Sequence, residues 1–507
     1  MSSAVIQQNS VWLNFNRQSF PQLNAPINVD VAIIGGGITG LTAGYLLTQA
    51  GKKVAILEKG QIGGAETGHT TAHLTLITDE PLANLVSNFG KRGAQLAWQG
   101  GKIAIDVIEA VVAQERLACD FKRVPNYVHA SLVDNQDERG ELRKFAELAN
   151  ELGFNGEFME DVPLVHQPGV RFADQGLFHP IKYLDGVAGA ITRQGGSIYE
   201  HSEVTQVHDD PLILIANGLE IRCQKMIVAT HSPMQGVENL LSALILQTKV
   251  AAYNTYAVGG KISHQTLDAA SFYDTSEPYN YLRVENDGTD SYAILGGMDH
   301  KTGQNDEEVD YHARLEELLT QLLPEVAIDH HWTGQVLEPL DGLPYIGPVN
   351  AEQFVATGYA GNGMTFGTLS GMMAADWFLG KNNPWEQLFQ AERINVSTAW
   401  NYLVENKDYP WYLIKGFMST PAAQSIQEIL VGEGKILILN GERAAVYRQA
   451  DGGVAACSAV CPHMGCVVRW NHEDTTWDCP CHGSRFNTEG MVLAGPAEKP
   501  LKPLMFQ

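Results

Sequence analysis

The sequence of 507 residues lacks the long hydrophobic runs that a membrane-spanning helix needs. Its apolar stretches are interrupted by Gly, Asn or a charged residue before roughly 18 residues have passed. The first thirty residues also lack the basic start and the apolar core of a signal peptide. We therefore expect a soluble, cytoplasmic protein with no transmembrane segment.

Positive charge is scarce as well. The chain has 34 Lys and Arg against 58 Asp and Glu, which gives a formal net charge of -24. Because no Lys/Arg-rich run is present, nucleic acid is excluded as an expected partner. The acidity is typical of a well-solvated surface. The length predicts two or three domains.

Cysteine is sparse, and its distribution excludes a disulfide framework. Seven cysteines are present, and four of them lie within 21 positions near the C-terminus: Cys461, Cys466, Cys479 and Cys481. In a reducing compartment such a group indicates a metal or cluster site. The others are interpreted as small buried hydrophobic side chains: Cys119, Cys223 and Cys457.

A glycine-rich turn follows an apolar strand near the N-terminus. Residues 29–34 form this strand, and the turn carries three glycines in GxGxxG spacing, Gly35, Gly37 and Gly40. They permit a tight turn, close approach to a pyrophosphate, and packing of the following helix on the strand. A second strand, 53–57, ends in Glu58, which is placed to bind a ribose 2'-hydroxyl. The motif predicts a dinucleotide site but leaves NAD and FAD open.

A second glycine-lined helix start lies over 300 residues further along the chain. A strand from Phe354 leads through Gly358, Gly361 and Gly363 into a helix predicted over 365–379. Such helix starts attract anionic oxygens. The combination resembles the amino-acid and amine oxidase family, which includes D-amino-acid, glycine and sarcosine oxidases. The resemblance spans about residues 28–380 and implies FAD, with a substrate domain inserted at about 80–170 and 240–330.

The resemblance also implies a set of FAD contacts. A Gly/Thr-rich loop, 63–73, would pass over the flavin ring. His69 lies where dimethylglycine and sarcosine dehydrogenases carry a histidine covalently joined to FAD, and covalent attachment here stays open. The predicted FAD contacts are Gly35, Gly37, Ile38, Thr39, Gly40, Glu58, Lys59, His69, Thr70, Thr71, Val204, Ala229, Thr230, Gly358, Gly361, Gly363 and Met364.

The catalytic residues are not identified by the sequence. In D-amino-acid and glycine oxidases an arginine soon after a Trp-x-Gly pattern clamps the substrate carboxylate. In this chain Trp332-Thr-Gly is followed by Gln335, so this mode of binding an α-amino acid is not expected. The candidates for substrate contact are Arg283, Tyr256, Tyr281 and His179. Their alternatives are a solvated arginine, core packing and a structural turn.

Cysteine and histidine occur together in two short C-terminal motifs. These motifs are Cys461-Pro-His463-Met-Gly-Cys466 and Cys479-Pro-Cys481-His482-Gly-Ser484. Each offers one thiolate and one imidazole, a donor set that could also hold tetrahedral zinc. The pattern over about 425–507, with a third loop at Gly495-Pro-Ala, resembles the Rieske [2Fe-2S] proteins of cytochrome bc complexes. This resemblance implies a disulfide between Cys466 and Cys481, and the iron ligands Cys461, His463, Cys479 and His482.

Two further residues bear on the reduction potential of such a cluster. Its two imidazole ligands raise the potential above that of all-cysteine ferredoxins. Ser484 matches the family serine that donates to a bridging sulfide, whereas Phe486 stands where high-potential members have a tyrosine. Because one hydrogen bond to sulfur is lost, we expect a potential below the bc range and above that of plant ferredoxins.

The predicted fold class is α/β (α+β). An N-terminal extension, 1–28, precedes a Rossmann-type FAD-binding domain with an inserted mixed-sheet substrate domain, 29–380. A partly helical linker, 381–424, is too rich in apolar and aromatic residues for a flexible tether. An all-β Rieske domain, 425–507, follows.

The combined cofactors, FAD and a [2Fe-2S] cluster, predict an oxidoreductase. It would dehydrogenate an amine or amino-acid-like small molecule and pass electrons from FAD to the cluster, then to an unidentified acceptor protein. The alternatives are a flavin reductase fed by a donor protein through the cluster, and an electron-transfer or redox-sensing module without small-molecule turnover. A Rieske oxygenase is less favoured because no two-histidine, one-carboxylate site for mononuclear iron is evident.

Overall fold

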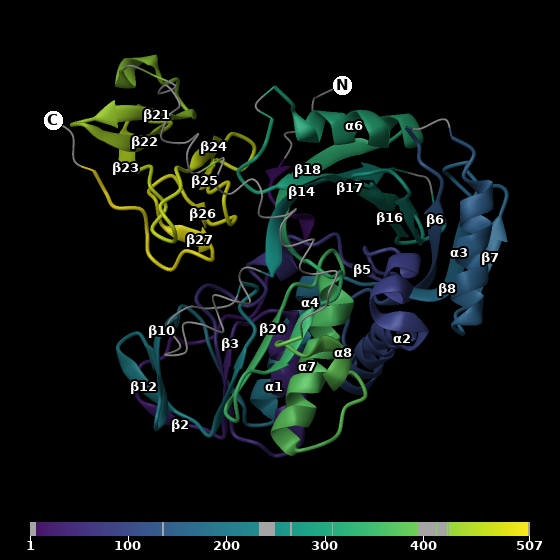
Figure 1. Cartoon of the computed structure of the whole chain (residues 1–507), viewed down its shortest axis with the longest axis horizontal. Coiled ribbons are helices and arrows are strands. Elements are labelled where there is room, and N and C mark those ends of the chain that lie inside the picture. Colours follow the sequence, from purple (N-terminus) through teal and green to yellow (C-terminus); the bar gives the residue numbers. More distant parts are fainter. Residues whose placement is uncertain are drawn as a thin grey trace.

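The computed structural model describes residues 7–133, 136–232, 249–263, 266–306, 308–393, 412, 423 and 425–504. Figure 1 shows three regions: a sheet with flanking helices around β3 and α7, a larger sheet around β14 and β17, and the C-terminal strands β21–β27. The fold class expected from the sequence is confirmed, with both mixed sheets and an all-strand C-terminal region. Among the described residues no helix is both long and apolar enough to cross a membrane.

The glycine-rich turn lies at the centre of a six-stranded sheet. The strand order is β19 (Tyr345–Pro348), β20 (Gln353–Thr357), β13 (Lys225–Val228), β3 (Val31–Ile34), β4 (Val54–Leu57) and β9 (Ser197–Tyr199). All neighbours are parallel except β19 and β20. Strands β3 and β4 are buried throughout, as expected for parallel strands covered on both faces.

Helices cover this sheet. They are α1 (Ile38–Gln49), α4 (Pro180–Arg193) and α7 (Gly363–Leu379). The two helices that begin at glycine turns, α1 and α7, pack directly on each other. Their close approach depends on Gly371, where a Cβ atom would lie 2.6 Å from Cβ of Thr42. The predicted order of strand, turn and helix is thus present at both glycine motifs.

A ten-stranded sheet forms the second region. Its main path is β1 (Gln7–Gln8), β18 (Ala327–Pro339), β14 (Val250–Ile262), β17 (Ser291–Lys301), β16 (Tyr281–Asn286), β15 (Ala270–Asp274), β6 (Lys122–His129), β8 (Gly169–Leu177) and β5 (His73–Leu74), with β7 (Gly156–Met159) paired to β8. Three helices accompany it: α2 (Leu82–Glu115), α3 (Arg139–Glu151) and α6 (Tyr311–Leu322). Apart from β1, its strands fall within 73–177 and 250–339, close to the predicted insertions at about 80–170 and 240–330.

The N-terminal segment is part of the fold from Gln7 onward. Strand β1 extends the large sheet beside β18, and Trp12 is buried. Strand β2 (Ile27–Asn28) completes a small sheet with β10 (Val204–Asp209), β11 (Leu212–Ala216) and β12 (Leu219–Arg222). The predicted N-terminal extension therefore contributes one strand to each of two sheets.

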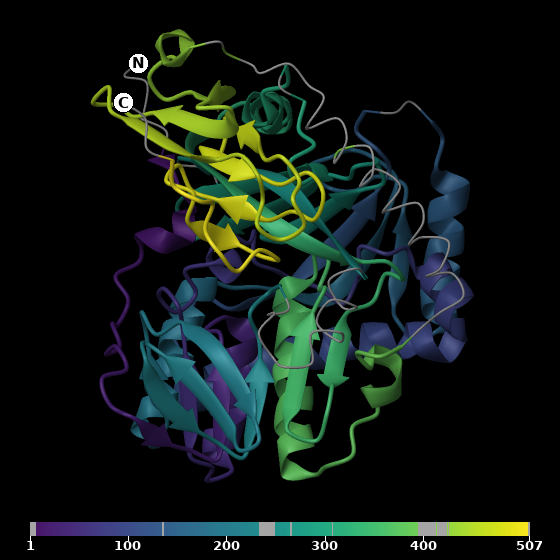
Figure 2. The same ribbon diagram turned by 60° about the vertical axis from the view of Figure 1, so that its left-hand side comes forward.

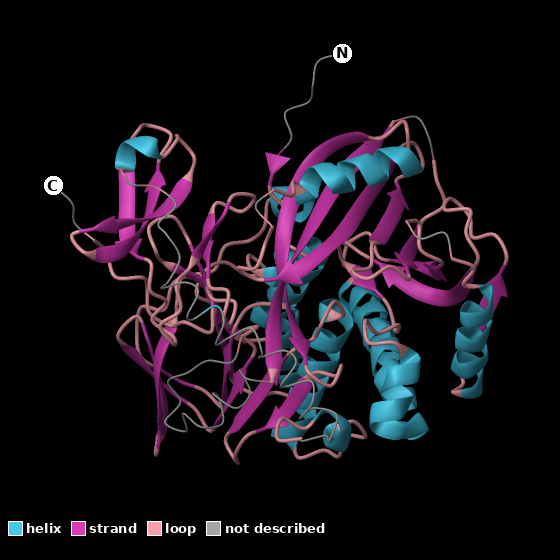
Figure 3. Cartoon of the chain, turned by 45° about the horizontal axis from the view of Figure 1, so that its top comes forward, coloured by secondary structure: helices cyan, strands magenta, loops and turns pink. Residues whose placement is uncertain are grey.

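The C-terminal region contains two small antiparallel sheets. One comprises β21 (Gly434–Leu439), β22 (Glu442–Arg448) and β23 (Val454–Ser458); the other comprises β24 (Arg469–Asn471), β25 (Thr476–Asp478), β26 (Arg485–Phe486) and β27 (Val492–Ala494). In Figure 2 this yellow region lies against the teal strands of the large sheet. In Figure 3 it consists of strands and loops apart from one short helical turn, Ile426–Glu428.

The predicted linker is described only over its first part. Helix α8 (Glu386–Phe389) follows α7, and the Trp385 indole donates to the carbonyl of Leu96 in α2 at 2.9 Å. Arg393 is buried and forms an ion pair with buried Asp341. Residues 381–393 therefore pack on the first two regions. Most of the remaining predicted linker lies outside the described residues.

Candidate functional site

A cavity of about 530 Å³ lies between the six-stranded and ten-stranded sheets. The turn before α1 and the start of α7 meet there, so two segments over 300 residues apart in the sequence line one space. Parallel strands place the turns at their carboxyl ends together, and such edges bind dinucleotides. The cavity is therefore the candidate site for FAD and substrate.

The first glycine turn has the geometry that its sequence predicted. Gly35 has φ +107, and a Cβ atom there would collide with the carbonyl of Ala229, directly after the neighbouring strand β13. A Cβ atom at Gly40 would collide with the carbonyl of Gly35. The carboxylate of Glu58 accepts hydrogen bonds from Gly36 N at 2.8 Å and Gly60 N at 2.7 Å. Glu58 is thereby fixed at the cavity wall.

Most of the predicted FAD contacts line this cavity. They are Gly35, Gly37, Ile38, Thr39, Glu58, Lys59, His69, Thr70, Thr71, Val204, Ala229, Thr230, Gly361, Gly363 and Met364. Gly40 and Gly358 do not line it. Gly40 instead allows α1 to pack on the turn, and Gly358 adopts φ +73 before α7. Their contribution is conformational.

Of the four predicted catalytic candidates, one lines the cavity and three do not. Tyr281 lines the cavity, with its hydroxyl 2.6 Å from Thr255 Oγ1. Arg283, Tyr256 and His179 do not line it, and they are withdrawn as substrate contacts. Each of the three has a structural reason for its position.

Arg283 is fully buried, so it is neither a substrate contact nor a solvated surface arginine. Its guanidinium donates to the carbonyls of Ala72 at 2.9 Å and Phe178 at 3.0 Å, and it pairs with Glu285. The ring of Trp12 lies 4.9 Å from it. The N-terminal segment thus closes this position off from the cavity.

Tyr256 and His179 serve packing. Tyr256 follows cavity-lining Thr255 in β14, and successive strand residues point to opposite faces. Its ring therefore stacks on Tyr311 of α6 at 4.6 Å. His179 is the N-cap of α4 and accepts a hydrogen bond from Lys182 N. Its ring lies 5.0 Å from that of Trp12.

Several polar and aromatic residues of the cavity wall were not predicted. They are His73, Thr75, Asp79, His231, Tyr273, Tyr279, Asp299 and Tyr359. Burial raises the pKa of Asp299 to about 7 and also raises the pKa of Asp79. Burial lowers the pKa of His73 to about 3, so its ring is neutral at pH 7. No local motif marked these residues.

The two C-terminal Cys/His motifs fold into matching loops. In each, the carbonyl of the first cysteine accepts a hydrogen bond from a glycine four residues later: Gly465 N to Cys461 O at 3.0 Å, and Gly483 N to Cys479 O at 2.9 Å. Both glycines have positive φ, +82 and +73. This conformation favours glycine and explains its place in both motifs.

The loops bring the four predicted iron ligands together. Cys461 and Cys479 are buried and close enough to share a hydrogen bond, which lowers the pKa of Cys461 to about 7. The rings of His463 and His482 lie 4.9 Å apart and nearly perpendicular. Burial lowers both imidazole pKa values, that of His482 to about 4, which favours the neutral form that binds metal.

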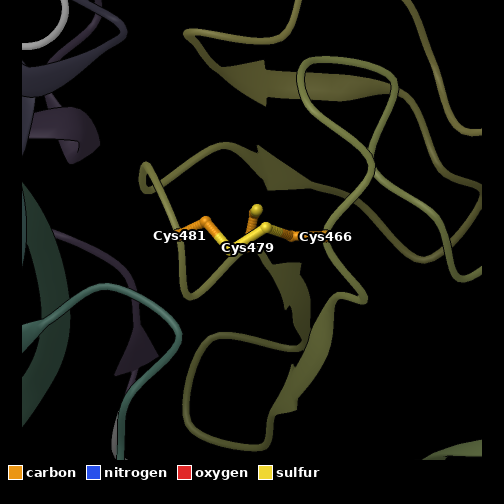
Figure 4. Close-up of side chains that lie close together, drawn as sticks. All are labelled: Cys466, Cys479 and Cys481. Carbon is orange, nitrogen blue, oxygen red and sulfur yellow. A yellow bond between two sulfur atoms is a disulfide. The ribbon is translucent and has the colours of Figure 1, made fainter. Parts of the chain in front are cut away.

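The surroundings of these four residues fit an iron-sulfur cluster. Neither ring nitrogen of His463 has a hydrogen-bond partner among the described residues. Cys466 and Cys481 form a disulfide across the two loops, which confirms the predicted pair, and Cys479 lies beside it (Figure 4). Ser484 Oγ accepts from Ala497 N at 2.9 Å, and this bond joins the third loop to the site. Phe486 is fully buried.

The cluster loops contact the wall of the cavity directly. Gln335 and Gly334 of β18 line the cavity, and Gln335 Nε2 donates to the carbonyl of Gly483 at 2.8 Å. Gln335 N donates to Glu66 on the cavity side at 2.7 Å. One buried residue thus joins the cavity to the loop of His482.

Further contacts hold the two regions together. Gln304 Nε2 donates to the carbonyl of Pro480 at 3.0 Å, and Asn254 donates to buried Asp478 at 3.3 Å. Residues 495–499 of the third loop line the cavity themselves. Lys59 Nζ donates to the carbonyl of Leu493 at 2.9 Å.

Comparison with known proteins agrees with this division. Residues 30–377 match the FAD dependent oxidoreductase family. The chain belongs to this family. Residues 422–505 match the Rieske [2Fe-2S] domain, so the protein carries FAD and a [2Fe-2S] cluster. It is an oxidoreductase with two cofactors, as the sequence predicted.

Three relatives illustrate the family. The Rieske 2Fe-2S iron-sulfur protein YhfW of Bacillus subtilis (strain 168) is 30% identical over 96% of this chain and 95% of its own. Gamma-glutamylputrescine oxidoreductase of Escherichia coli (strain K12) is 24% identical over 71% of this chain and 86% of its own. The structure of glycine oxidase from Geobacillus kaustophilus has a TM-score of 0.60 at 20% identity, covering 72% of this chain and 99% of its own. The glycine oxidase likeness concerns the fold.

Proposed function

We propose that this protein dehydrogenates a small-molecule amine or amino-acid-like compound and passes the electrons from FAD to the Rieske cluster, then to an external acceptor protein. The observation that carries the proposal is the shared wall at Gln335. Its backbone faces the FAD cavity, and its side chain binds the loop that bears a predicted cluster ligand. The proposal is supported by this single residue of β18, which contacts both the cavity wall and the cluster loop.

The contact between the regions is formed by buried residues, which supports direct transfer. Gln335, Asn254 and Asp478 are each less than 4% exposed. Gly303 has φ +76 and packs so closely that a Cβ atom would lie 2.7 Å from Pro480 N. Hydrogen bonds between buried polar groups, such as that from Gln335 Nε2 to the carbonyl of Gly483, favour the arrangement in which they form. The cluster loop therefore stays beside the cavity.

Amine chemistry is supported by the cavity wall. FAD, when bound, accepts two electrons with hydride and can release them singly. No arginine lines the cavity in the described part of the chain, so a bidentate carboxylate clamp is missing there. The name of the Escherichia coli relative gives it an amine derivative as substrate. An amine is thus the favoured substrate class.

The internal transfer can be tested without knowing the substrate. FAD in anaerobic holoenzyme would be reduced by a light flash with a photosensitiser, and cluster reduction followed by freeze-quench electron paramagnetic resonance. We expect a first-order cluster signal whose rate is independent of protein concentration. A rate proportional to concentration would show transfer between molecules and overturn the proposal.

Spectroelectrochemistry tests the direction of flow. The proposal expects the two-electron potential of the bound FAD to lie below that of the cluster. An FAD potential above that of the cluster would favour the reverse flow, in which a donor protein reduces the cluster first. Absorbance at the flavin and cluster bands separates the two cofactors in one titration.

A further inference from the structure

Two carboxylates and four aromatic rings share one end of the FAD cavity. The carboxylates belong to Asp79 and Asp299, and the rings to His73, Tyr273, Tyr279 and Tyr281; all six line the cavity. They come from β5 and the loop after it, and from β15, β16 and β17 with their connections. Residues 73–79, 273–281 and 299 are separated in the sequence and meet only in the fold.

The rings form a continuous group around this end. The ring centroids of Tyr279 and Tyr281 are 5.5 Å apart, and those of Tyr273 and Tyr279 are 6.3 Å apart. His73 lies 5.2 Å from Tyr273 and 5.9 Å from Tyr281. Faces of aromatic rings carry negative partial charge and attract organic cations.

The carboxylates are held in place by neutral donors. Asp79 Oδ2 accepts from Gly361 N at 2.6 Å, and the Tyr279 hydroxyl also bonds to Asp79. Thr255 bonds to Asp299 through its hydroxyl. Asp299 Oδ1 is buried and has no hydrogen-bond partner among the described residues. A buried carboxylate oxygen without a partner is costly unless a ligand supplies one.

In the described part of the chain, no lysine or arginine is among the groups that act most strongly on these two carboxylates. The charged neighbours that act on Asp299 are Asp79 and Glu277, and the one that acts on Asp79 is Glu80. The two lysines in the cavity wall, Lys59 and Lys499, belong to the segments around β4 and the third cluster loop. Arg283 is occupied by backbone carbonyls and Glu285.

We propose that this end of the cavity binds an ammonium group, and that the substrate is an amine with a second cationic group, of the diamine class. Asp79 and Asp299 would accept hydrogen bonds from the ammonium group. The four aromatic rings would surround the methylene groups next to it. A carboxylate at the same place would face two buried carboxyl groups, which repel it whenever they are ionised. This assignment rests on the proposed function in that it treats the cavity as the substrate site.

Binding to the oxidised holoenzyme tests the proposal without turnover. Three probes of similar length would be titrated anaerobically while the flavin absorbance is recorded: 1,4-diaminobutane, butan-1-amine and 4-aminobutanoate. We expect 1,4-diaminobutane to bind with a Kd about tenfold or more below that of 4-aminobutanoate, because only the latter brings a carboxylate. Equal or tighter binding of 4-aminobutanoate would overturn the proposal.

Substitutions test whether Asp79 and Asp299 bind the cationic group. Asp299→Asn and Asp79→Asn should each raise the Kd of 1,4-diaminobutane about tenfold or more. Asp268→Asn changes an exposed aspartate of the same sheet region outside the cavity wall and should leave the Kd unchanged. An Asp299→Asn Kd equal to that of Asp268→Asn would refute the role of Asp299. The FAD content and cluster signal of each variant report its folding, and the comparison of probes on the unmodified protein is independent of any variant.

The same titrations separate the two proposals. If 1,4-diaminobutane binds as expected but reduces neither cofactor, the cation site stands and the proposed dehydrogenation fails. If an amino acid reduces FAD and then the cluster while the diamine does not bind, the proposed function stands and the cation site fails.

Discussion

Adding one methyl group at Gly303 should push the cluster loop away from the FAD cavity. A Cβ atom there would lie 2.7 Å from Pro480 N, which is 0.7 Å inside the 3.4 Å at which ordinary contact begins. The atoms it meets are backbone atoms of the second cluster loop, which cannot rotate away as a side chain would. Gly303→Ala must therefore separate the two regions or distort the loop that carries Cys479.

Gly288→Ala provides a matched control. Gly288 lies in the preceding hairpin of the same sheet with φ +92, and a Cβ atom there would meet nothing within 4 Å. Both substitutions place an L-residue in the left-handed region, which costs about 1–2 kcal/mol. The loss of thermal stability from backbone strain should therefore be similar in the two variants. Only Gly303→Ala adds the collision.

The assay is flash reduction of FAD with detection of the cluster by electron paramagnetic resonance. We expect Gly288→Ala to keep the rate of cluster reduction and the cluster spectrum of the unmodified protein. Gly303→Ala should slow cluster reduction while both cofactors remain bound. If Gly303→Ala gave the same rate as Gly288→Ala, the packing of Gly303 on the cluster loop would not govern the transfer.

Three other predictions address the separate sites. Gly40→Ala should abolish FAD retention, because its Cβ atom would collide with the backbone of Gly35. Gly140→Ala, in an open helical position, should keep FAD bound and stabilise the protein by about 0.5–1 kcal/mol. The FAD-to-protein ratio measures FAD retention, and thermal denaturation measures stability. Cys461→Ser should remove the cluster absorbance, and Cys457→Ser, at a buried thiol outside the two ligand motifs, should retain it; equal spectra would exclude Cys461 as a ligand. The affinity for 1,4-diaminobutane should fall as the pH falls through about 7, because burial, Asp79 and Glu277 raise the pKa of Asp299 to about 7 and only the ionised form attracts a cation. Calorimetric titration from pH 6 to 8 would detect this fall. The slope should be smaller in Asp299→Asn, where Asp79, whose pKa is also raised, is the remaining titrating carboxyl of the site, and an unchanged slope would contradict the role of Asp299.

Strand β14 and its neighbours show that the sequence alone did not reveal which face of a strand lines the cavity. Tyr256 was expected near substrate, but the neighbouring Thr255 faces the cavity and Tyr256 faces α6. A shift of one residue along a strand exchanges its two faces, and aromatic character alone does not reveal which face is turned to a site. Arg283 follows cavity-lining Tyr281 by two residues and shares its face, yet Trp12 and the carbonyls of Ala72 and Phe178 cover it.

Sequence alone determined the features that depend on local chemistry. Glycine is required where φ is positive or a Cβ atom would collide with backbone, so the turn at Gly35 and the two cluster loops could be recognised from spacing. The family resemblance implied the cysteine and histidine ligands of the Rieske motifs and the pairing of Cys466 with Cys481, and the structure contains that disulfide.

Only the tertiary structure decided what these features face. The group around Asp79 and Asp299 assembles from a loop and three strands, and the contact of Gln335 with Gly483 joins residues 148 positions apart. Such meetings depend on how strands pair and regions pack, because the energy of a buried charge or amide depends on its surroundings rather than on its neighbours in the chain. The sequence thus identified the two cofactors, and the packing of the chain around them decided which residues lie between them.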